Sequence, residues 1–571
     1  MPPEEGYGYP DRQVGKKRQR GKQNQGDPAI RLASQNVLWM GHTNLSSLVY
    51  LKGCTMTNAP TPTDLKRRDF LAQTAALGSA LALGSQPAAA QTQTPVRGGK
   101  LTIAATGAAP TDTLDPRTIT SVYHGMQGYL YGNCLTEMGE GNRLIGELAE
   151  SWETSQGGRR QVYKLRSGVT FHNGKPLTAA DVVWSMNLHR GADSKSGAKA
   201  LMQPVTDVRA DGNLVIFEMS EVYTDLPYVL SGQHMIIVPA NTTDFNAGIG
   251  TGPYMVQRFV PGQRIAGTRN PNYWKAGRAH VAECEMLAVG DTTARINALQ
   301  SGEVQMIERV DTRTAGLLER APGIQVLRSS TGAYRPFMML CDTAPFNNAD
   351  LRMALKLAIN REDMLRRVFR GFGRVGNDHP IGPADPFHGA DIPQRAYDPE
   401  QARSLYRRSG HSGPLQLSFS DVAFAEAPDA AALFKEHAAA AGIEIALVRE
   451  PNDGYWANVW RKKPFCAAAW GGRATAGIML ATAFKSDSSF NDSNWRAPEF
   501  DALLAQARSE LNDAKRRELY ASCQRMINMT GGCINPIFAD VLDAARSNVR
   551  GFFPGNFAMS GMRVAERVWL G

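Results

Sequence analysis

The sequence predicts an α/β protein that is large enough for at least two lobes. Short runs typical of β-strands are interspersed with amphipathic helical segments from residue 98 to the C-terminus, and no internal repeat interrupts them. The chain has 571 residues, whereas single hydrophobic cores stop growing at roughly 250–300 residues. A mixed architecture with more than one core is therefore expected.

Four segments have the pattern of strands. Residues 98–106 alternate apolar and polar side chains after a glycine pair, which is the period of a half-buried strand. Shorter strands are expected at 160–166, 213–219 and 234–239, where β-branched and aromatic residues gather.

Helix boundaries are marked by capping residues. Thr178 and Asp181 form a capping-box pattern at the start of a helix expected in 176–190. Gly302 is expected to stop the next helix, 291–304, in the left-handed conformation that glycine adopts without strain.

Four more helices are expected in the second half of the chain. The segment 348–369 has apolar residues at helical spacing and predicts one long amphipathic helix. In residues 397–410, Asp398 is the expected cap, Pro399 takes the first helical position and Gly410 stops the helix. Amphipathic helices are also expected at 497–511 and 514–527.

Arg67 and Arg68, followed by Asp-Phe-Leu, resemble a twin-arginine export signal. The apolar run 70–84 is shorter than the roughly twenty residues that a membrane-spanning helix needs, and Ala88–Ala90 supply small residues for cleavage. The alternative is a buried core helix. We expect residues 56–90 to be the signal and the mature periplasmic chain to begin at about Gln91.

Residues 1–55 are polar, with a basic cluster at 15–22. No helical or aromatic pattern accompanies this cluster, so a nucleic-acid partner is not expected. Because signal peptides lie at the N-terminus, we interpret Met56 as the initiator and residues 1–55 as disordered or untranslated.

The composition indicates a globular protein with an ordinary soluble surface and without a chain-derived metal cage. The net charge is +9, and charges of both signs are mixed after the signal, as on an ordinary soluble surface. No CxxC motif is present, and the histidines are dispersed. A Cys523–Cys533 bridge and buried free thiols both remain open.

Blocks that follow one another along the chain carry a family resemblance. They are LAESWETSQGGRRQVYKLRSGVTFHNGKPLTAADVVWSM (148–186), GTGPYMVQRFVPGQRIAGTRNPNYW (250–274), ARINALQSGEV (294–304), PFNNADLRMALKLAINRE (345–362), YDPEQARSLY (397–406) and the last two helices. In this order they resemble family 5 of the extracytoplasmic solute-binding proteins, the dipeptide, oligopeptide and nickel receptors of ABC importers. The resemblance covers nearly all of residues 97–571.

The resemblance implies the periplasmic-binding-protein fold, two α/β lobes joined by a hinge with the ligand cleft between them. Lobe I would comprise 97–330 plus 537–571, and lobe II would comprise 331–536, with crossings near 333–336 and 534–537. The protein would capture a peptide or similar small solute as a monomer. Its partners would be the permease subunits of an ABC importer and, for export, the twin-arginine machinery.

The stretch Trp470-Gly471-Gly472-Arg473 is the strongest candidate for solute contact. In peptide-binding members, as the resemblance implies, an acidic residue after this Trp meets the ligand's ammonium group. Here Arg473 takes that place, and a guanidinium favours a carboxylate or phosphate. The alternatives are core packing for Trp470 and a salt bridge outside the cleft for Arg473.

Six further residues are weaker candidates for solute contact. Tyr123 and His124 follow a family-like TLDP sequence, and Arg335 lies beside the expected crossing. Asn491, Asn494 and Trp495 are expected to approach from lobe II, although a turn that caps the next helix explains them almost as well. A structural role explains Arg335 equally well.

An enzymatic function is not expected. The sequence lacks G-x-S-x-G and H-E-x-x-H, and the glycines of 371–376 follow a helix rather than a strand, so they do not form a nucleotide loop. We expect no cofactor and no metal ligands. The alternatives are a periplasmic hydrolase of peptides or glycans with a carboxylate pair in the cleft, and a chaperone-like receptor with a large apolar cleft.

Overall fold

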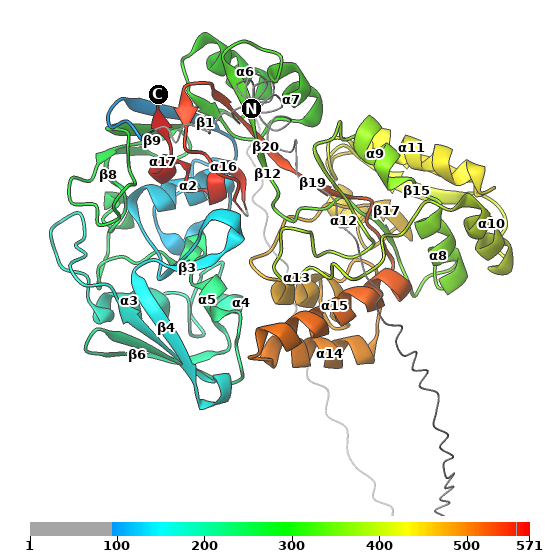
Figure 1. Ribbon diagram of the computed structural model, residues 1–571, viewed down its shortest axis with the longest axis horizontal. Coiled ribbons are helices and arrows are strands. Elements are labelled where there is room, and N and C mark those ends of the chain that lie inside the picture. Colours follow the sequence, from blue (N-terminus) through cyan, green and yellow to red (C-terminus); the bar gives the residue numbers. More distant parts are fainter. Residues whose placement is uncertain (1–93, 556) are drawn as a thin grey trace, which may run out of the picture. The chain divides into compact units, whose positions relative to one another are not determined.

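The computed structural model describes residues 94–555 and 557–571. The predicted export signal, the initiator Met56 and the segment 1–55 lie outside the described residues. The described part contains two large sheets and several small ones, surrounded by helices (Figure 1).

A seven-stranded mixed sheet forms the centre of the part that we call lobe I. Its order is β12-β20-β11-β1-β10-β9-β8. β1 is parallel to β10 and β11, whereas β20 is antiparallel to β11 and β12. The strands are β1 (Lys100–Ala105), β8 (Tyr254–Val260), β9 (Arg264–Arg269), β10 (Glu283–Ala288), β11 (Met306–Ile307), β12 (Ile324–Ser329) and β20 (Val541–Arg546).

Lobe I also contains a four-stranded antiparallel sheet of order β4-β5-β7-β6. These strands are β4 (Ala149–Ser155), β5 (Arg160–Leu165), β6 (Val205–Asp211) and β7 (Leu214–Met219). The helices of lobe I are α2 (Val122–Tyr131), α3 (Ala179–Asn187), α4 (Lys199–Met202), α5 (Leu226–Val229), α6 (Thr292–Ser301), α7 (Thr312–Leu318), α16 (Ala558–Gly561) and α17 (Val564–Arg567).

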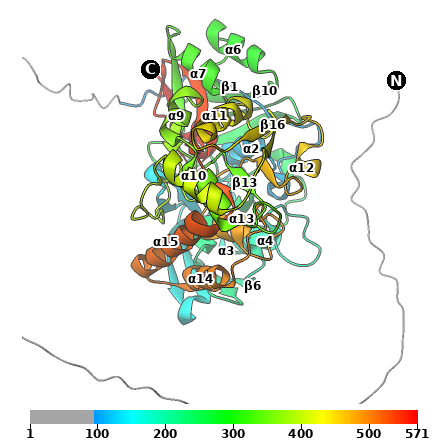
Figure 2. The same ribbon diagram turned by 90° about the vertical axis from the view of Figure 1, so that its right-hand side faces the viewer.

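A five-stranded sheet of order β16-β15-β17-β13-β18 forms the centre of lobe II. Its strands are β13 (Phe337–Met339), β15 (Leu415–Phe419), β16 (Ile445–Arg449), β17 (Phe465–Ala467) and β18 (Cys533–Ile534). The helices are α8 (Ala349–Leu357), α9 (Arg361–Arg367), α10 (Pro399–Arg408), α11 (Ala427–Ala440), α12 (Tyr455–Asn458), α13 (Ala476–Phe484), α14 (Pro498–Ser509) and α15 (Asp513–Thr530). α14 and α15 lie side by side in both views (Figures 1 and 2).

Three two-stranded sheets complete the fold. They pair β2 (Thr136–Met138) with β3 (Leu144–Gly146), β14 (Gly373–Val375) with β19 (Ile537–Ala539), and β21 (Val549–Arg550) with β22 (Trp569–Leu570). Within the described residues, no helix is both long and apolar enough to cross a membrane.

The predicted caps are confirmed. Thr178 and Asp181 form a complete capping box at α3. The Asp398 side chain accepts a hydrogen bond from the Gln401 amide at α10, and Gly302 ends α6 in the left-handed conformation at φ 85°. These helix ends are therefore set by local side-chain chemistry.

The prediction of one long helix over 348–369 is wrong. The structure divides this segment into α8 and α9, because the Asn360 side chain accepts a hydrogen bond from the Asp363 amide and starts a new helix. The apolar spacing does not reveal the break, because both helices bury an apolar face in the same core and the periodicity continues on each side.

The strand expected at 234–239 is also absent. Residues 233–235 form a 3-10 turn, and the buried residues that follow run extended without a neighbouring strand. The Ile237 amide donates to the Asn133 carbonyl at 2.9 Å, and the Val238 amide donates to Ser185 Oγ at 3.1 Å. Single hydrogen bonds to Asn133 and Ser185 thus replace the regular hydrogen bonds that a neighbouring strand would supply.

The chain passes between the two large sheets twice, and the two crossings contact each other. The Arg335 amide donates to the Ile537 carbonyl at 3.1 Å, and the Ala539 amide donates to the Ala333 carbonyl at 2.8 Å. Tyr334 forms single β-bridges with Trp470 and Phe538. One segment links β12 to β13, and the other links β18 to β20. Together they form a short hydrogen-bonded unit, which we call the connector.

The cysteines of the described residues are free thiols. Cys523 and Cys533, whose pairing the sequence left open, are both buried and unpaired with each other. Burial raises the pKa of the Cys523 thiol to about 12. These cysteines act as small apolar core residues in this structure.

Candidate solute-binding cleft

Residues 471–473 lie where three cavities meet. Gly472 lines all three of them. The largest, which we call the hinge-side cavity, has a volume of about 610 Å³ and is lined by both connector segments. A second cavity of about 500 Å³ lies between α2 and α5 of lobe I and α13 of lobe II, and we call it the apolar chamber. This junction is the candidate binding site.

Trp470 is fixed in the wall of the hinge-side cavity by the connector. Its backbone exchanges hydrogen bonds of 3.0 and 3.1 Å with Tyr334, and the two rings stack with an interplanar angle of 4°. The indole Nε1 donates to Asp492 Oδ2 at 2.8 Å. Trp470 is only 5% exposed, so it both packs in the core and presents one edge to the cavity.

Asp492 is a buried carboxylate that holds two indoles. Besides Trp470, the Nε1 of Trp460 donates to its Oδ2 at 3.1 Å. Burial raises the pKa of the Asp492 carboxyl to about 6. The position of the cavity wall therefore depends on a polar group that has no contact with the cavities themselves.

The glycine pair has a steric explanation at one of its two positions. A Cβ atom on Gly472 would lie 1.8 Å from the Thr331 carbonyl oxygen, which is backbone of the connector. A Cβ atom on Gly471 would meet only the Arg473 side chain, at 3.9 Å. The close approach of residue 472 to the connector therefore requires glycine.

Arg473 is exposed to the cleft and lines both the apolar chamber and a smaller pocket beside it. Its Nη1 donates to the Gly471 and Gly472 carbonyls at 3.2 and 3.4 Å, and its guanidinium lies 5.5 Å from the Trp470 ring centre. No ion pair in the described part of the chain includes Arg473. Its charge is therefore available to an anion from solution.

Arg335 lines the hinge-side cavity. Its Nη1 donates to the Tyr334 carbonyl at 3.1 Å and to the Trp470 carbonyl at 3.4 Å. Burial lowers the pKa of the guanidinium, and Glu426, which lines the same cavity, opposes this shift. Arg335 thus combines the structural and the cavity-facing roles between which the sequence could not decide.

Tyr123 and His124 lie in the core of lobe I, on α2, and are 0% and 1% exposed. Tyr123 Oη donates to the Met286 carbonyl at 3.3 Å, and His124 Nε2 lies 2.5 Å from the Thr113 carbonyl. They are absent from the cavity linings described here, whereas the preceding residue, Val122, lines the hinge-side cavity. Helical geometry turns these neighbours in different directions, and solute contact by Tyr123 and His124 stays a prediction.

Asn491, Asn494 and Trp495 form a turn that lies apart from these cavity linings. Asn491 Nδ2 donates to the Trp495 carbonyl at 2.7 Å, and Asn494 Nδ2 reaches the Asp342 carboxylate at 3.2 Å. The turn does not cap the next helix, because α14 begins after Ala497 without a side-chain cap. Solute contact by this group also stays a prediction.

The C-terminal segment lines the site, which the sequence did not indicate. Met559, Ser560, Gly561 and Met562 have φ values of 53, 56, 68 and 64°, so they form one left-handed turn. The Met559 amide donates to the buried Asp543 Oδ2 at 2.7 Å. Left-handed backbone is strained for residues other than glycine and persists only where the surroundings fix it. No sequence pattern predicts such a turn.

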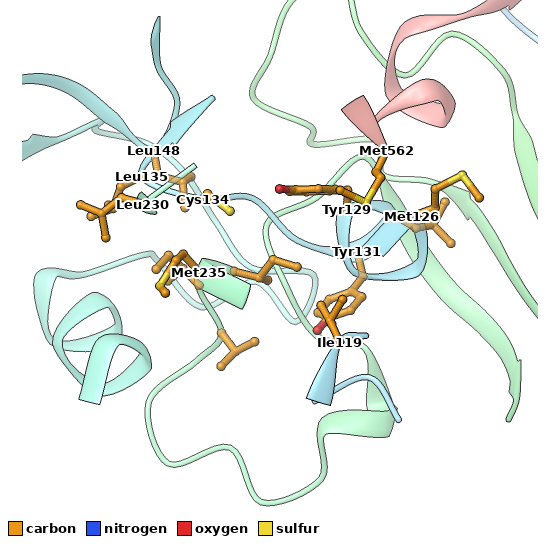
Figure 3. Packing of buried hydrophobic residues seen from close by; sticks show 14 of the residues in the cluster. Ile119, Met126, Tyr129, Tyr131, Cys134, Leu135, Leu148, Leu230, Met235 and Met562 are labelled. Carbon is orange, nitrogen blue, oxygen red and sulfur yellow. The ribbon is translucent and has the colours of Figure 1, made fainter. Parts of the chain in front are cut away.

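A buried network of ion pairs fixes the residues that follow this turn. Arg563 pairs with Glu147 at 2.6 Å, and Lys275 bridges Glu137, Glu147 and Glu566 at 2.6 to 2.9 Å. Figure 3 shows Met126, Tyr129, Tyr131 and Met562 in the buried cluster around α2. The C-terminus is therefore an integral part of lobe I and of the cleft wall.

Two sheet-bearing lobes, a doubly crossed connector and cavities between the lobes define a two-lobed solute-binding protein. Family 5 of the bacterial extracellular solute-binding proteins matches residues 143–492, which is more than half of the chain. The protein belongs to this family, whose members deliver solutes to ABC importers. The hydrolase alternative has no support, since the relatives are binding proteins.

Curated relatives and solved structures agree with this assignment. Heme-binding protein A of Haemophilus influenzae is 27% identical over 69% of this chain and 79% of its own. Glutathione-binding protein GsiB of Escherichia coli O6:K15:H31 is 24% identical over 77% of this chain and 88% of its own.

Among solved structures, HbpA2 from Haemophilus parasuis has a TM-score of 0.72 at 19% identity, covering 83% of this chain and 100% of that chain. The oligopeptide-binding protein AppA from Bacillus subtilis, in complex with a nonapeptide, has a TM-score of 0.65 at 20% identity, covering 84% and 100%. These structures share the two-lobed fold. Within the described residues, no group of three or more His, Cys, Asp or Glu side chains is arranged to hold a metal ion.

Proposed function

We propose that the protein is the periplasmic receptor of an ABC importer and captures a peptide or similar small solute that has an anionic end. The observation that carries this proposal is Arg473, a cleft-facing guanidinium that hydrogen-bonds only backbone carbonyls among the residues that the structure describes. A carboxylate bound there would gain a charge-assisted, bidentate contact. Trp470, Gly471, Gly472 and Arg335 would shape the surrounding wall.

The lobe boundaries that we propose are 97–330 plus 537–571 for lobe I and 331–536 for lobe II. The change of sheet between β12 and β13, and again between β18 and β20, supports them. So do the hydrogen bonds between the connectors. A solute that binds both lobes better in the closed arrangement would shift the population toward it.

We also propose export through the twin-arginine route, with a mature chain from about Gln91. The Arg67-Arg68 pair before an apolar run supports this proposal. N-terminal sequencing of the periplasmic protein tests the cleavage site. A precursor whose intact mass requires Met1 would contradict initiation at Met56.

Native mass spectrometry of receptor purified from its own periplasm would test the binding proposal. We expect a bound small molecule that contains an acid group, released from the Arg473→Gln variant at lower collision energy. A bound ligand with an ammonium group and no acid group would overturn the role of Arg473. Turnover of a peptide panel by the purified protein would contradict a purely binding function.

A further inference from the structure

The apolar chamber has an unusual lining for a cleft that binds a charged solute. Its walls come from α2, α4 and α5 of lobe I, α13 of lobe II and the C-terminal turn. Apolar and aromatic side chains are the largest group in the lining, and the uncharged polar side chains of Ser231, Gln233 and Thr482 lie beside them. The apolar and aromatic residues are Tyr129, Met138, Leu201, Tyr228, Val229, Ala474, Ile478, Phe557 and Met562. With about 500 Å³, it could hold on the order of fifteen waters. Such a volume lies within the range of pockets that bind organic molecules.

The titratable side chains of Arg, His, Asp or Glu type that line this chamber are all basic. Its lining includes Arg473, Arg563 and His234 but no aspartate or glutamate. The Arg563 guanidinium is neutralised by Glu147, with contacts of 2.6 and 2.8 Å. Burial lowers the pKa of His234, whose Nδ1 lies 2.9 Å from the Pro116 carbonyl. At neutral pH, Arg473 is therefore the lining residue whose charge lacks a carboxylate within the described part of the chain.

Arg473 is a solvent-exposed residue in the lining of the apolar chamber. It is exposed to the cleft, and the next turn of chain, through Ala474 to Ile478, continues along the chamber wall. A molecule that places a carboxylate on Arg473 can therefore direct its remaining atoms between Ile478 and the lobe I residues Leu201 and Val229. Burial of apolar atoms in this volume is favourable, whereas burial of unpaired amide groups is costly.

We propose that the solute is an amphipathic carboxylic acid, with its carboxylate on Arg473 and its apolar body in the apolar chamber. This inference rests on the proposed function and deepens it by naming the class of substrate. A strongly hydrophilic peptide would place part of its backbone against Leu201, Val229 and Ile478, which offer its amides no side-chain hydrogen-bond partners. A solute that ends in an ammonium group would be repelled by Arg473.

A chain-length series tests the inference by isothermal titration calorimetry. The probes are the sodium salts of unbranched alkanoic acids from butanoate to decanoate, with hexanamide and octanamide as uncharged controls and Gly-Gly as a hydrophilic carboxylate. We expect affinity to rise about fourfold for each methylene, which corresponds to roughly 0.8 kcal/mol per buried CH₂, until the chamber is full. The amides should bind at least tenfold more weakly than the matching acids.

Two pairs of variants test separately the contact of Arg473 with the carboxylate and the contact of Ile478 with the apolar part of the solute. Arg473→Gln should weaken all alkanoates by a similar factor, whereas Arg496→Gln, at an exposed residue before α14, should leave them unchanged. Ile478→Phe should weaken octanoate and decanoate more than butanoate, because it fills the chamber. Ile478→Ala should move the optimum toward longer chains. Circular dichroism and thermal melting verify that each variant is folded.

The outcomes distinguish this inference from the proposed function. If Gly-Gly binds and closes the lobes while the alkanoates show no dependence on length, the receptor function stands and the amphipathic substrate class is overturned. If length dependence is present but Ile478 variants do not alter it, the apolar chamber is not the binding site. If no carboxylate binds, and Arg473→Gln does not alter the retention of the ligand that is purified with the receptor, both proposals fail.

Discussion

At the scale of single residues, the cleft wall depends on the buried Asp492 side chain, which fixes the position of Trp470. Asp492 accepts hydrogen bonds from Trp460 and Trp470 through the same oxygen, Oδ2, while its Oδ1 has no hydrogen-bond partner in the described structure. A buried carboxylate is costly unless it is well paired, and the raised pKa of Asp492 expresses that cost.

The pH dependence of stability follows from the direction of this shift. The pKa of Asp492 is raised from 3.8 to about 6 in the folded protein, so the folded state binds this proton more tightly than the unfolded state. Its stabilising effect is complete below about pH 4 and is lost as the pH rises through about 6. Asp492→Asn should therefore gain stability relative to the wild type between pH 4 and 7, by on the order of 2–3 kcal/mol.

Chemical unfolding of both proteins at several pH values measures this difference. Asn keeps an acceptor for the two indoles, so tryptophan fluorescence of the folded variant should resemble that of the wild type. A stability difference that is constant from pH 4 to 8 would show that Asp492 does not titrate in this window.

Gly472 offers a second prediction at this scale. Gly472→Ala would force the chain away from the Thr331 carbonyl, since the added atom would lie at 1.8 Å. We expect a loss of roughly 1–3 kcal/mol in unfolding free energy and weaker solute binding. Gly471→Ala is the matched control, because its Cβ meets only a flexible side-chain end at 3.9 Å. Equal melting temperatures for the two variants would refute the steric argument.

At the scale of elements, short polar side chains decide where helices begin. Asn348 caps α8 and Asn360 caps α9, each by accepting a hydrogen bond from the third residue beyond it. The cap at Asn360 interrupts a segment whose apolar spacing alone would support a continuous helix. The resulting bend lets α8 and α9 both contribute to the core around β13 and α11.

Replacement of Asn360 tests this role. Asn360→Ala should reduce the free energy of unfolding by about 1 kcal/mol, the usual value for loss of an N-cap, without changing the affinity for solute. Urea titration and calorimetry give the two quantities. Asn360→Asp, which preserves the acceptor, should restore most of the stability; failure of this rescue would indicate a role other than capping.

At the scale of the whole molecule, residues of the two proposed lobes contact each other directly in the structure. Thr224 Oγ1 of lobe I donates to the Arg508 carbonyl of lobe II at 2.9 Å. Asp225 is buried beside the start of α13, and its pKa is raised by burial. We expect these groups, which are remote from Arg473 in sequence, to stabilise the arrangement that the solute binds.

Thr224→Val should therefore weaken solute binding by about three- to tenfold, which corresponds to the net value of one hydrogen bond. The residue is not one of those that line the apolar chamber, so the loss reports on closure. Thr242→Val, which removes a local bond to the Pro239 carbonyl, is the control and should bind normally. Small-angle scattering with and without solute should show a smaller change in radius of gyration for the Thr224 variant.

The sequence predicted the individual elements better than their arrangement. Caps at Thr178, Asp398 and Gly302 are local, so their residues suffice to place the helix ends. The segment 234–239 has strand composition but forms no ladder, because its hydrogen-bond partners come from residues 133 and 185. Phe557 and Met562 line the site, and the neighbouring residues Met559 and Arg563 are held by Asp543 and by an ion pair with Glu147.

The sequence by itself determined the family, the mixed α/β class and the departure at Arg473, since these depend on the order and chemistry of nearby residues. Only the tertiary structure decided that Arg473 is an exposed residue in the lining of an apolar chamber and that Gly472 contacts the connector. The physical reason is that a cavity is formed by surfaces from distant segments, and its shape depends on packing among them. Neither property is encoded in any single stretch of the chain.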